Sequence, residues 1–302
     1  MVRRSLFVAC AVLLATSAAS ARGWDPPSWT LTMDAFGTSN AFPGSVGTGP
    51  DRGVQSALEA SAGLRLSRAL KAGFTASAGG LLQREFTRAN YGWLSAGSTL
   101  RRNKTQLVAE LEWTPRRDKF PSDPEEGGTY EGLAFTAGMR WALGARARLR
   151  LDATADHATF EPGFGARDSR GRELYAQATL SASPTTDLRA DARVSHDETR
   201  AARFTKDTRV VGAGAVWKRG AWRADALVRS GLRRYPDANR VDSNFRRRDQ
   251  WVDARLKLVR ALRPRLALSL AGSLANQSSS RLDRGFDVHT LSFGLEWTGG
   301  GH

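Results

Sequence analysis

Cysteine is almost absent from this chain of 302 residues, in which Cys10 is the single example. Long apolar runs are equally scarce, because nothing beyond the N-terminus approaches the roughly 20 consecutive apolar residues of a membrane-spanning helix. With a mean hydropathy of −0.41 and 25% charged residues, the composition excludes a bundle of such helices. It does not exclude a closed membrane barrel, whose strands present apolar side chains to lipid only at every second residue.

The N-terminus has the three parts of a secretory signal peptide. Arg3 and Arg4 form a basic start, residues 5–16 an apolar run, and Ala19-Ser20-Ala21 a cleavage site of small residues. We therefore expect residues 1–21 to be removed and residues 22–302 to form one domain. Cys10 leaves with the signal peptide, so the mature chain has no cysteine for a disulfide or a thiolate metal site. The formal net charge falls from +15 to +13 when Arg3 and Arg4 are removed.

Apolar and polar residues alternate along most of the mature chain. Residues 147–156 (ARLRLDATAD) show the pattern best, with alanine or leucine at every second position and arginine, aspartate or threonine between them. A helix would mix these two sets around its circumference, whereas a strand separates them on two faces. The period of two therefore predicts β-strands.

The same alternation predicts fourteen strands. We place them at 29–36, 54–67, 71–84, 91–100, 105–114, 130–141, 147–157, 172–182, 187–196, 208–217, 222–233, 249–258, 265–275 and 287–297. Short turns are expected around 68–70, 101–104, 142–146, 183–186, 218–221 and 259–264. Longer loops are expected at 37–53, 85–90, 115–129, 158–171, 197–207, 234–248 and 276–286. An even number of strands, joined by short turns at one end and longer loops at the other, is typical of an outer-membrane barrel. The predicted fold class is all-β: a transmembrane up-and-down antiparallel barrel with periplasmic turns and extracellular loops.

Tryptophan gathers at two levels of these predicted strands. Trp29, Trp141, Trp217, Trp222 and Trp297 fall at the periplasmic ends, and Tyr91, Trp93, Trp113 and Trp251 fall near the loop ends. Amphipathic aromatic side chains at two levels are typical of the girdles at the two membrane interfaces. A soluble β-sandwich would instead place such large side chains at mid-strand, where this sequence has mostly alanine, leucine and valine.

The mature chain resembles Gram-negative outer-membrane barrels over its whole length, including a last strand rich in aromatic residues (LSFGLEW, 291–297). This resemblance implies location in the bacterial outer membrane. The sequence also has short motifs that are similar to motifs in the barrel portion of surface lipoprotein assembly modifiers and related export barrels. They are Gly37-Thr38-Ser39-Asn40, and Ser280, Arg281 and Phe286. That second resemblance implies a part in lipoprotein or polysaccharide export.

The predicted periplasmic turns carry bases and no acid. The bases are Arg68, Lys71, Arg101, Arg102, Lys104, Arg146, Lys218, Arg219, Arg260 and Arg263. They form either a solvated rim or a surface that attracts anionic lipid or an acidic periplasmic protein. We expect lipid and lipopolysaccharide as neighbours of a monomeric barrel, and no nucleic acid, because an outer-membrane protein does not meet the genome.

Acids and bases alternate on the predicted inner face. The candidate pore-lining residues are Arg148, Arg150, Asp152, Asp156, Arg189, Asp191, Arg193, Arg223, Asp225, Arg229, Asp253, Arg255 and Lys257. Opposite charges on neighbouring strands attract and help to set register, and they also suit the wall of a water-filled channel. Fourteen strands enclose more space than the eight that side chains just fill. The favoured hypothesis is a passive channel for small hydrophilic solutes, and the alternative is a non-enzymatic export barrel.

Catalytic, metal and cofactor sites find little support in the sequence. His196 lies within Ser195-His196-Asp197-Glu198, and such residue types can activate water or serine, but its parity places it on the lipid side, as it does for His157. Asp123, Glu125 and Glu126 can bind a divalent cation, although a solvated acidic loop is the simpler interpretation. No motif for a phosphate, zinc or haem group is present. We therefore predict no enzymatic activity, no metal and no cofactor.

Overall fold

A computed structural model describes residues 24–39, 51–67, 69–83, 91–119, 128–160, 165–241, 244–280 and 285–300. Fourteen strands make up nearly all of this part of the chain. The first seven are β1 (Trp24–Thr38), β2 (Asp51–Arg65), β3 (Leu70–Gln83), β4 (Tyr91–Arg102), β5 (Thr105–Lys119), β6 (Gly128–Ala142) and β7 (Ala147–Phe160). The others are β8 (Ser169–Ser183), β9 (Thr186–Thr199), β10 (Lys206–Arg219), β11 (Trp222–Arg234), β12 (Arg248–Arg263), β13 (Leu266–Ser279) and β14 (Phe286–Gly300). Two 3-10 turns, η2 (Gly165–Arg167) and η3 (Ala202–Phe204), lie in the longer connections, and no described helix is long and apolar enough to cross a membrane.

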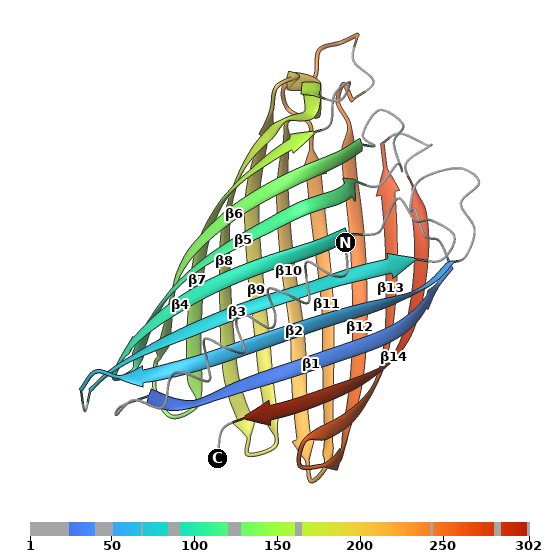
Figure 1. Ribbon diagram of the computed structural model, residues 1–302. Coiled ribbons are helices and arrows are strands. Elements are labelled where there is room, and N and C mark those ends of the chain that lie inside the picture. Colours follow the sequence, from blue (N-terminus) through green and yellow to red (C-terminus); the bar gives the residue numbers. More distant parts are fainter. Residues whose placement is uncertain are drawn as a thin grey trace.

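The strands form one closed antiparallel barrel (Figure 1). Each strand pairs with the next along the chain, and β1 pairs with β14 from Ser28 against Gly300 to Thr38 against Thr290. The predicted fold class and strand number are thus confirmed. A closed barrel leaves no sheet edge unpaired, which is what a strand structure needs in lipid.

The two ends of the barrel differ in their connections. At one end the turns are short, as between β10 and β11, where Gly220 has a φ of 57°, and between β4 and β5, where Asn103 has a φ of 53°. Left-handed backbone at such positions is what a tight hairpin turn requires. The other end carries the longer connections, among them 235–247 between β11 and β12. This asymmetry assigns the short turns to the periplasmic end and the loops to the outer end.

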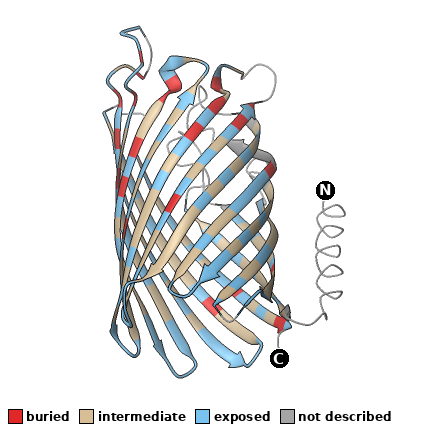
Figure 2. Cartoon of the chain, turned by 90° about the vertical axis from the view of Figure 1, so that its left-hand side faces the viewer, coloured by how far each residue is buried: buried red, intermediate tan, exposed pale blue. Residues whose placement is uncertain are grey.

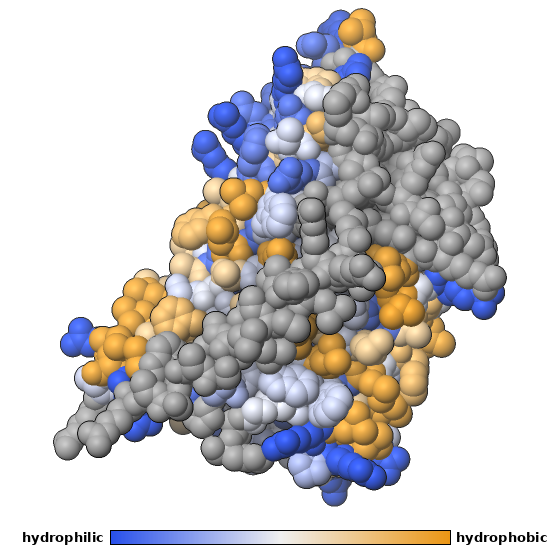
Figure 3. All heavy atoms as spheres, in the orientation of Figure 1, coloured by the Kyte–Doolittle hydropathy of each residue, from blue (hydrophilic) through white to orange (hydrophobic). Residues whose placement is uncertain are grey.

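Apolar side chains point outward, which is the reverse of their arrangement in a soluble protein. The alternation of apolar and polar residues in the sequence encodes this arrangement. On β7 to β10, for example, Leu151, Leu174, Leu188, Val194 and Val211 are all exposed on the outside of the barrel. Few described apolar residues are buried, and the burial pattern alternates along the strands (Figure 2). In the space-filling view, hydrophobic side chains gather at the left and right of the wall near mid-height, and hydrophilic ones toward its upper and lower ends (Figure 3). An outward apolar face of this kind is suited to lipid.

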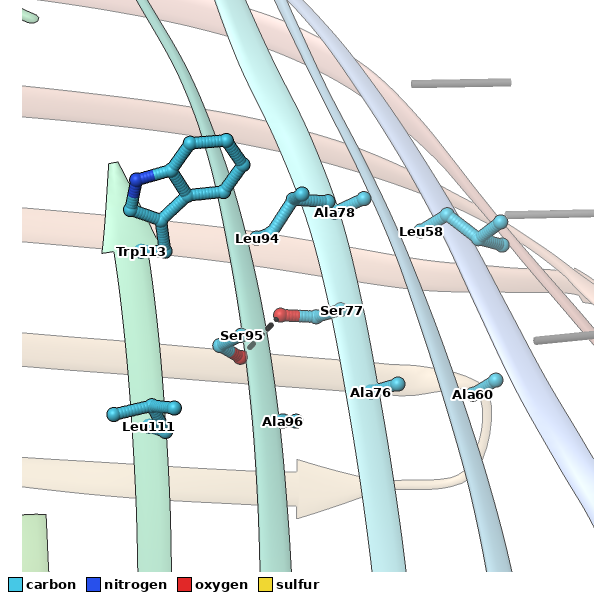
Figure 4. Close-up of a pocket in the computed structure, with 10 residues that line it drawn as sticks. All are labelled: Leu58, Ala60, Ala76, Ser77, Ala78, Leu94, Ser95, Ala96, Leu111 and Trp113. Carbon is cyan, nitrogen blue, oxygen red and sulfur yellow. Dashed lines mark hydrogen bonds between the residues drawn. The ribbon is translucent and has the colours of Figure 1, made fainter. Parts of the chain in front are cut away.

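A shallow apolar depression marks the outward wall across β2 to β5 (Figure 4). It has a volume of about 260 Å³ and is lined by small residues such as Ala60, Ala76 and Ala96 and by larger ones that include Leu111 and Trp113. Its outward position makes it a place for lipid chains rather than for a solute inside the barrel.

The structure corrects two of the predicted girdle residues. Trp93 lies across Gly79 of β3, and Trp251 lies across Gly231 of β11. Both glycines are on the inner face, so both indoles face the lumen and not the membrane. Trp113 is outward and donates its indole N–H to Glu131 at 2.7 Å. The side chain of Tyr91 lies outside the described residues.

At the periplasmic end, the aromatic prediction is supported by direct contacts. Trp29 and Trp297, on the paired strands β1 and β14, meet edge to face with ring centroids 5.6 Å apart. Arg260 lies over the ring of Trp222 at 5.2 Å. Most strands are longer than predicted, and β1 begins at Trp24, early enough for Asp25 to form an ion pair with Lys71. The basic periplasmic end therefore has an acid that the predicted strand boundaries left out.

Candidate functional site: the inner wall

All thirteen candidate pore-lining residues lie on the inner face of four strands. They are Arg148, Arg150, Asp152 and Asp156 on β7; Arg189, Asp191 and Arg193 on β9; Arg223, Asp225 and Arg229 on β11; and Asp253, Arg255 and Lys257 on β12. Their parity follows from the exposed apolar residues between them, such as Leu151 on β7, Val194 on β9 and Val228 on β11. This face is called the charged wall below.

Ion pairs on the charged wall span an intervening strand. Arg229 Nε donates to Asp191 Oδ2 at 3.2 Å, although β10 lies between their strands. Arg189 likewise contacts Asp225 on β11 at 2.5 Å. Both contacts cross β10 where its inner face has Gly212 and Gly214, which have no side chain to block them. The absence of a Cβ on β10 therefore lets β9 and β11 share their charges.

Two carboxylates of the charged wall lie directly over glycine residues of neighbouring strands. Asp152 lies across Gly138, its direct partner on β6, and Asp191 lies across Gly212 on β10. A Cβ at either glycine would overlap the carboxylate. The acids are consequently held flat against the wall, where Arg150 pairs with Asp152.

In two pairs of this wall the base is more exposed to the lumen than the acid. The side chain of Arg255 is 63% exposed and that of its partner Asp253 is 13% exposed, and the corresponding values are 28% for Arg229 and 2% for Asp191. Lysine and arginine stems are long, and they carry their charge away from the wall while the short aspartate stays close to it. At these two pairs a solute in the lumen meets the guanidinium group before the carboxylate, whereas Arg189 and Asp225 are about equally exposed.

A pocket of about 240 Å³ opens on the charged wall. Its lining combines Arg150, Asp152, Asp191, Arg193 and Arg229 with five polar residues that the sequence reasoning did not single out. These five are Glu110, Thr136, Thr154, Glu173 and Tyr175. Their strands alternate in the same way, so parity alone could have placed them on the inner face. What parity could not supply is that strands β5 to β11 bring them together.

The remaining inner face is much less charged. On β3 and β4 it presents small polar groups, as in the hydrogen bond of 2.8 Å between Ser77 and Ser95 (Figure 4). On β1, Asp34 accepts a hydrogen bond from Ser269 of β13 at 3.3 Å. On β2, Glu59 is an exposed acid of this part of the inner face. The lumen is polar on all sides, and its arginines are concentrated on one wall.

The other candidate residues are not assembled into a site. His196 faces outward, as predicted, and its Nδ1 lies 2.7 Å from Asp207 Oδ1, while His157 Nδ1 lies 3.0 Å from the carbonyl oxygen of Ser169. Asp123, Glu125 and Glu126 fall outside the described residues. Within the described ranges, no group of three or more histidine, cysteine, aspartate or glutamate residues is placed to hold a metal ion.

Comparison with known proteins supports the fold at low sequence identity. No family model matches the chain, and no curated protein matches it in sequence. Among solved structures, it is similar to OmpT, an outer membrane protein of Vibrio cholerae (TM-score 0.55, 6% identity, 93% of this chain and 99% of that one). It is also similar to the outer membrane channel DcaP of Acinetobacter baumannii (TM-score 0.54, 10% identity, 93% and 99%). A third similar structure is the CymD monoaromatic hydrocarbon channel (TM-score 0.50, 11% identity, 92% and 89%).

These structures share the fold of the chain, and sequence identities this low support no conclusion beyond the fold. The closed barrel, its outward apolar face and its uneven ends are the properties that an outer membrane requires. The protein has the fold of an outer-membrane β-barrel.

Proposed function

We propose that this barrel is a passive channel for small hydrophilic solutes and works as a monomer. The observation that carries the proposal is the inner wall, which is lined with polar and charged side chains from β5 to β12 and has its carboxylates folded against the strands. A wall of this kind solvates ions and sugars, and fourteen strands enclose more space than side chains fill. We also propose that residues 1–21 are a signal peptide, on the basis of the basic start, the apolar run and the small residues at the cleavage site; residues 1–23 lie outside the described residues.

Swelling of liposomes that contain the protein purified from the outer membrane tests the proposal. The liposomes are expected to swell in an isotonic solution of a monosaccharide, and to swell more slowly in isotonic solutions of larger sugars. Thr136 faces the lumen near mid-strand and hydrogen-bonds Thr154, whereas its neighbour Ala137 faces outward. Thr136→Trp is expected to slow swelling, and Ala137→Trp, which adds the same bulk on the lipid side, is expected to leave the rate unchanged.

Folded protein that does not support swelling by any sugar would contradict the channel. That result would favour the export hypothesis suggested by Ser280, Arg281 and Phe286, in which the barrel stays closed until a partner binds its periplasmic end. Equal slowing by both tryptophan variants would show that swelling does not depend on the lumen.

A further inference from the structure

Arginines also collect on the outward face of the barrel, at the outer ends of β8 to β12. Arg172, Arg209, Arg234 and Arg248 are exposed there, and each has the parity of an exposed apolar residue on its own strand. On β10, for example, Arg209 precedes Val211 by two residues, and Val211 is 62% exposed. These guanidinium groups therefore point away from the lumen.

Strand register places most of these groups in one row. Arg172 is the direct partner of His196, His196 of Asp207, Asp207 of Arg234, and Arg234 of Arg248. Adjacent strands are about 4.8 Å apart, so the row is a continuous strip across five strands. Arg170 and Arg209 lie beside it on the same face. We call these seven residues the outer basic row.

Most of the positive charge of the row is uncompensated. Asp207 is engaged by His196 at 2.7 Å, and Glu198 lies opposite Arg170. Asp287, further along on β14, accepts a hydrogen bond from Asn276. Within the described parts of the chain, the side chains of Arg172, Arg209, Arg234 and Arg248 form no ion pair. Exposed cations next to an apolar membrane face attract the anionic groups of lipid headgroups.

A hollow adjoins the row, and most of the residues that line it have the parity of the outward face. It has a volume of about 450 Å³ and is lined by Arg209, by the apolar Val211 and Val252, and by polar groups that include Gln250 and Ser278. Leu232 on β11 and Gln250 on β12 also line the hollow. The next outward-facing residues toward the outer end are Arg234 on β11 and Arg248 on β12. Lining of this kind combines a cation, hydrogen-bonding groups and apolar surface.

We propose that the outer basic row and this hollow bind a phosphorylated glycolipid of the outer leaflet, the lipid A part of lipopolysaccharide. The row holds a phosphate group, Gln250 and Ser278 face the sugar, and Val211 and Val252 contact the first part of an acyl chain. The guanidinium fork suits phosphate because it donates parallel hydrogen bonds. The inference rests on the membrane location of the barrel and does not depend on whether its lumen conducts.

The test compares two double variants of the full-length protein, purified from the outer membrane in detergent and freed of bound lipid. Arg209→Gln with Arg234→Gln removes two charges from the row. Arg102→Gln with Arg260→Gln removes two outward charges from the periplasmic end and is the matched control. Binding of lipid A is measured by thermophoresis, and a difference in gel migration between boiled and unboiled samples checks that each variant is folded.

We expect the first double variant to bind lipid A about twentyfold more weakly, because each cation near an anionic lipid surface contributes roughly a fivefold factor. The control variant and Arg209→Lys with Arg234→Lys are expected to bind nearly as the parent does. Lipid A without its phosphates is expected to bind as weakly to the parent as intact lipid A binds to the first variant.

Four results would overturn the proposal: equal binding by the two glutamine variants, equal binding of lipid A with and without phosphates, equal binding of phosphatidylglycerol, or competition by millimolar inorganic phosphate. The last two would assign the row to anionic lipid in general or to free phosphate. If the first variant does not fold, Arg209→Gln and Arg248→Gln are tested singly, each with an expected loss of about fivefold.

Discussion

Arg229 reaches from β11 across β10 to Asp191 on β9, and it passes over Gly212. The contact joins residues 38 positions apart in the sequence, and a side chain at position 212 would meet both partners. One glycine thus decides whether the two strands on either side of β10 share an ion pair.

Gly212→Ala is expected to destabilise the barrel. The new methyl group would overlap the Asp191 carboxylate and the Arg229 stem, which must then move, and overpacking of this kind typically costs about 1–3 kcal/mol. The measurement is the urea concentration at which half of the protein unfolds. Gly37→Ala is the control, because a Cβ at Gly37 meets nothing within 4 Å. Equal shifts for the two variants would contradict the role assigned to Gly212.

Asp249→Asn is expected to loosen the outer connection between β11 and β12. Asp249 is fully buried and accepts two hydrogen bonds from Arg247, at 3.1 and 3.0 Å, and one from Ser279. Loss of its charge removes a carboxylate from the buried Arg247 guanidinium, and breaking a buried ion pair of this kind costs about 3–5 kcal/mol. Limited proteolysis should cut the connection at 235–247 faster in this variant.

Asp253→Asn is the matched control on the same strand. Asp253 pairs with Arg255 at 3.4 Å, but the Arg255 side chain is mostly exposed, so water replaces the lost partner. Its proteolysis rate should stay close to that of the parent. A large effect at position 253 together with none at position 249 would reverse the expected order.

Trp251 and Trp297 should report opposite sides of the wall. The indole of Trp251 lies over Gly231 on the inner face, and that of Trp297 is exposed on the outward face. In two variants whose single remaining tryptophan is Trp297 or Trp251, out of the nine in the chain, brominated lipid is expected to quench Trp297 strongly and Trp251 weakly, and acrylamide in the aqueous phase to do the reverse. Equal quenching by brominated lipid would place both indoles in the membrane.

The sequence was sufficient for the strands and their two faces, because one outward apolar face forces a period of two. Residues 147–156 display that period without interruption, and the structure keeps their parity throughout β7. The prediction placed Trp251 in the membrane girdle because it is an aromatic residue near a strand end, and its position in the alternation was not taken into account. It alternates with Val252 and Ala254 and therefore belongs with Asp253 and Arg255 on the inner side.

Contacts between strands could not be read from the sequence. The pairing of Arg189 with Asp225 depends on the register of three strands, on the turns that fix it, and on the bare inner face of β10 at Gly214. Each of these is a long-range property, since a period of two is satisfied by any even shift of register. The same limit applies to the outer basic row, whose members come from five strands.

Single-channel recording in a planar bilayer tests the central claim most directly. With the purified protein added to one side, the account predicts discrete and stable conductance steps, and it predicts that Thr136→Trp reduces their size while Ala137→Trp does not. A salt gradient across the bilayer would read the weak ion preference expected of a lumen that carries both signs of charge. A folded protein that inserts into the bilayer and carries no current would contradict the claim that the barrel is a channel.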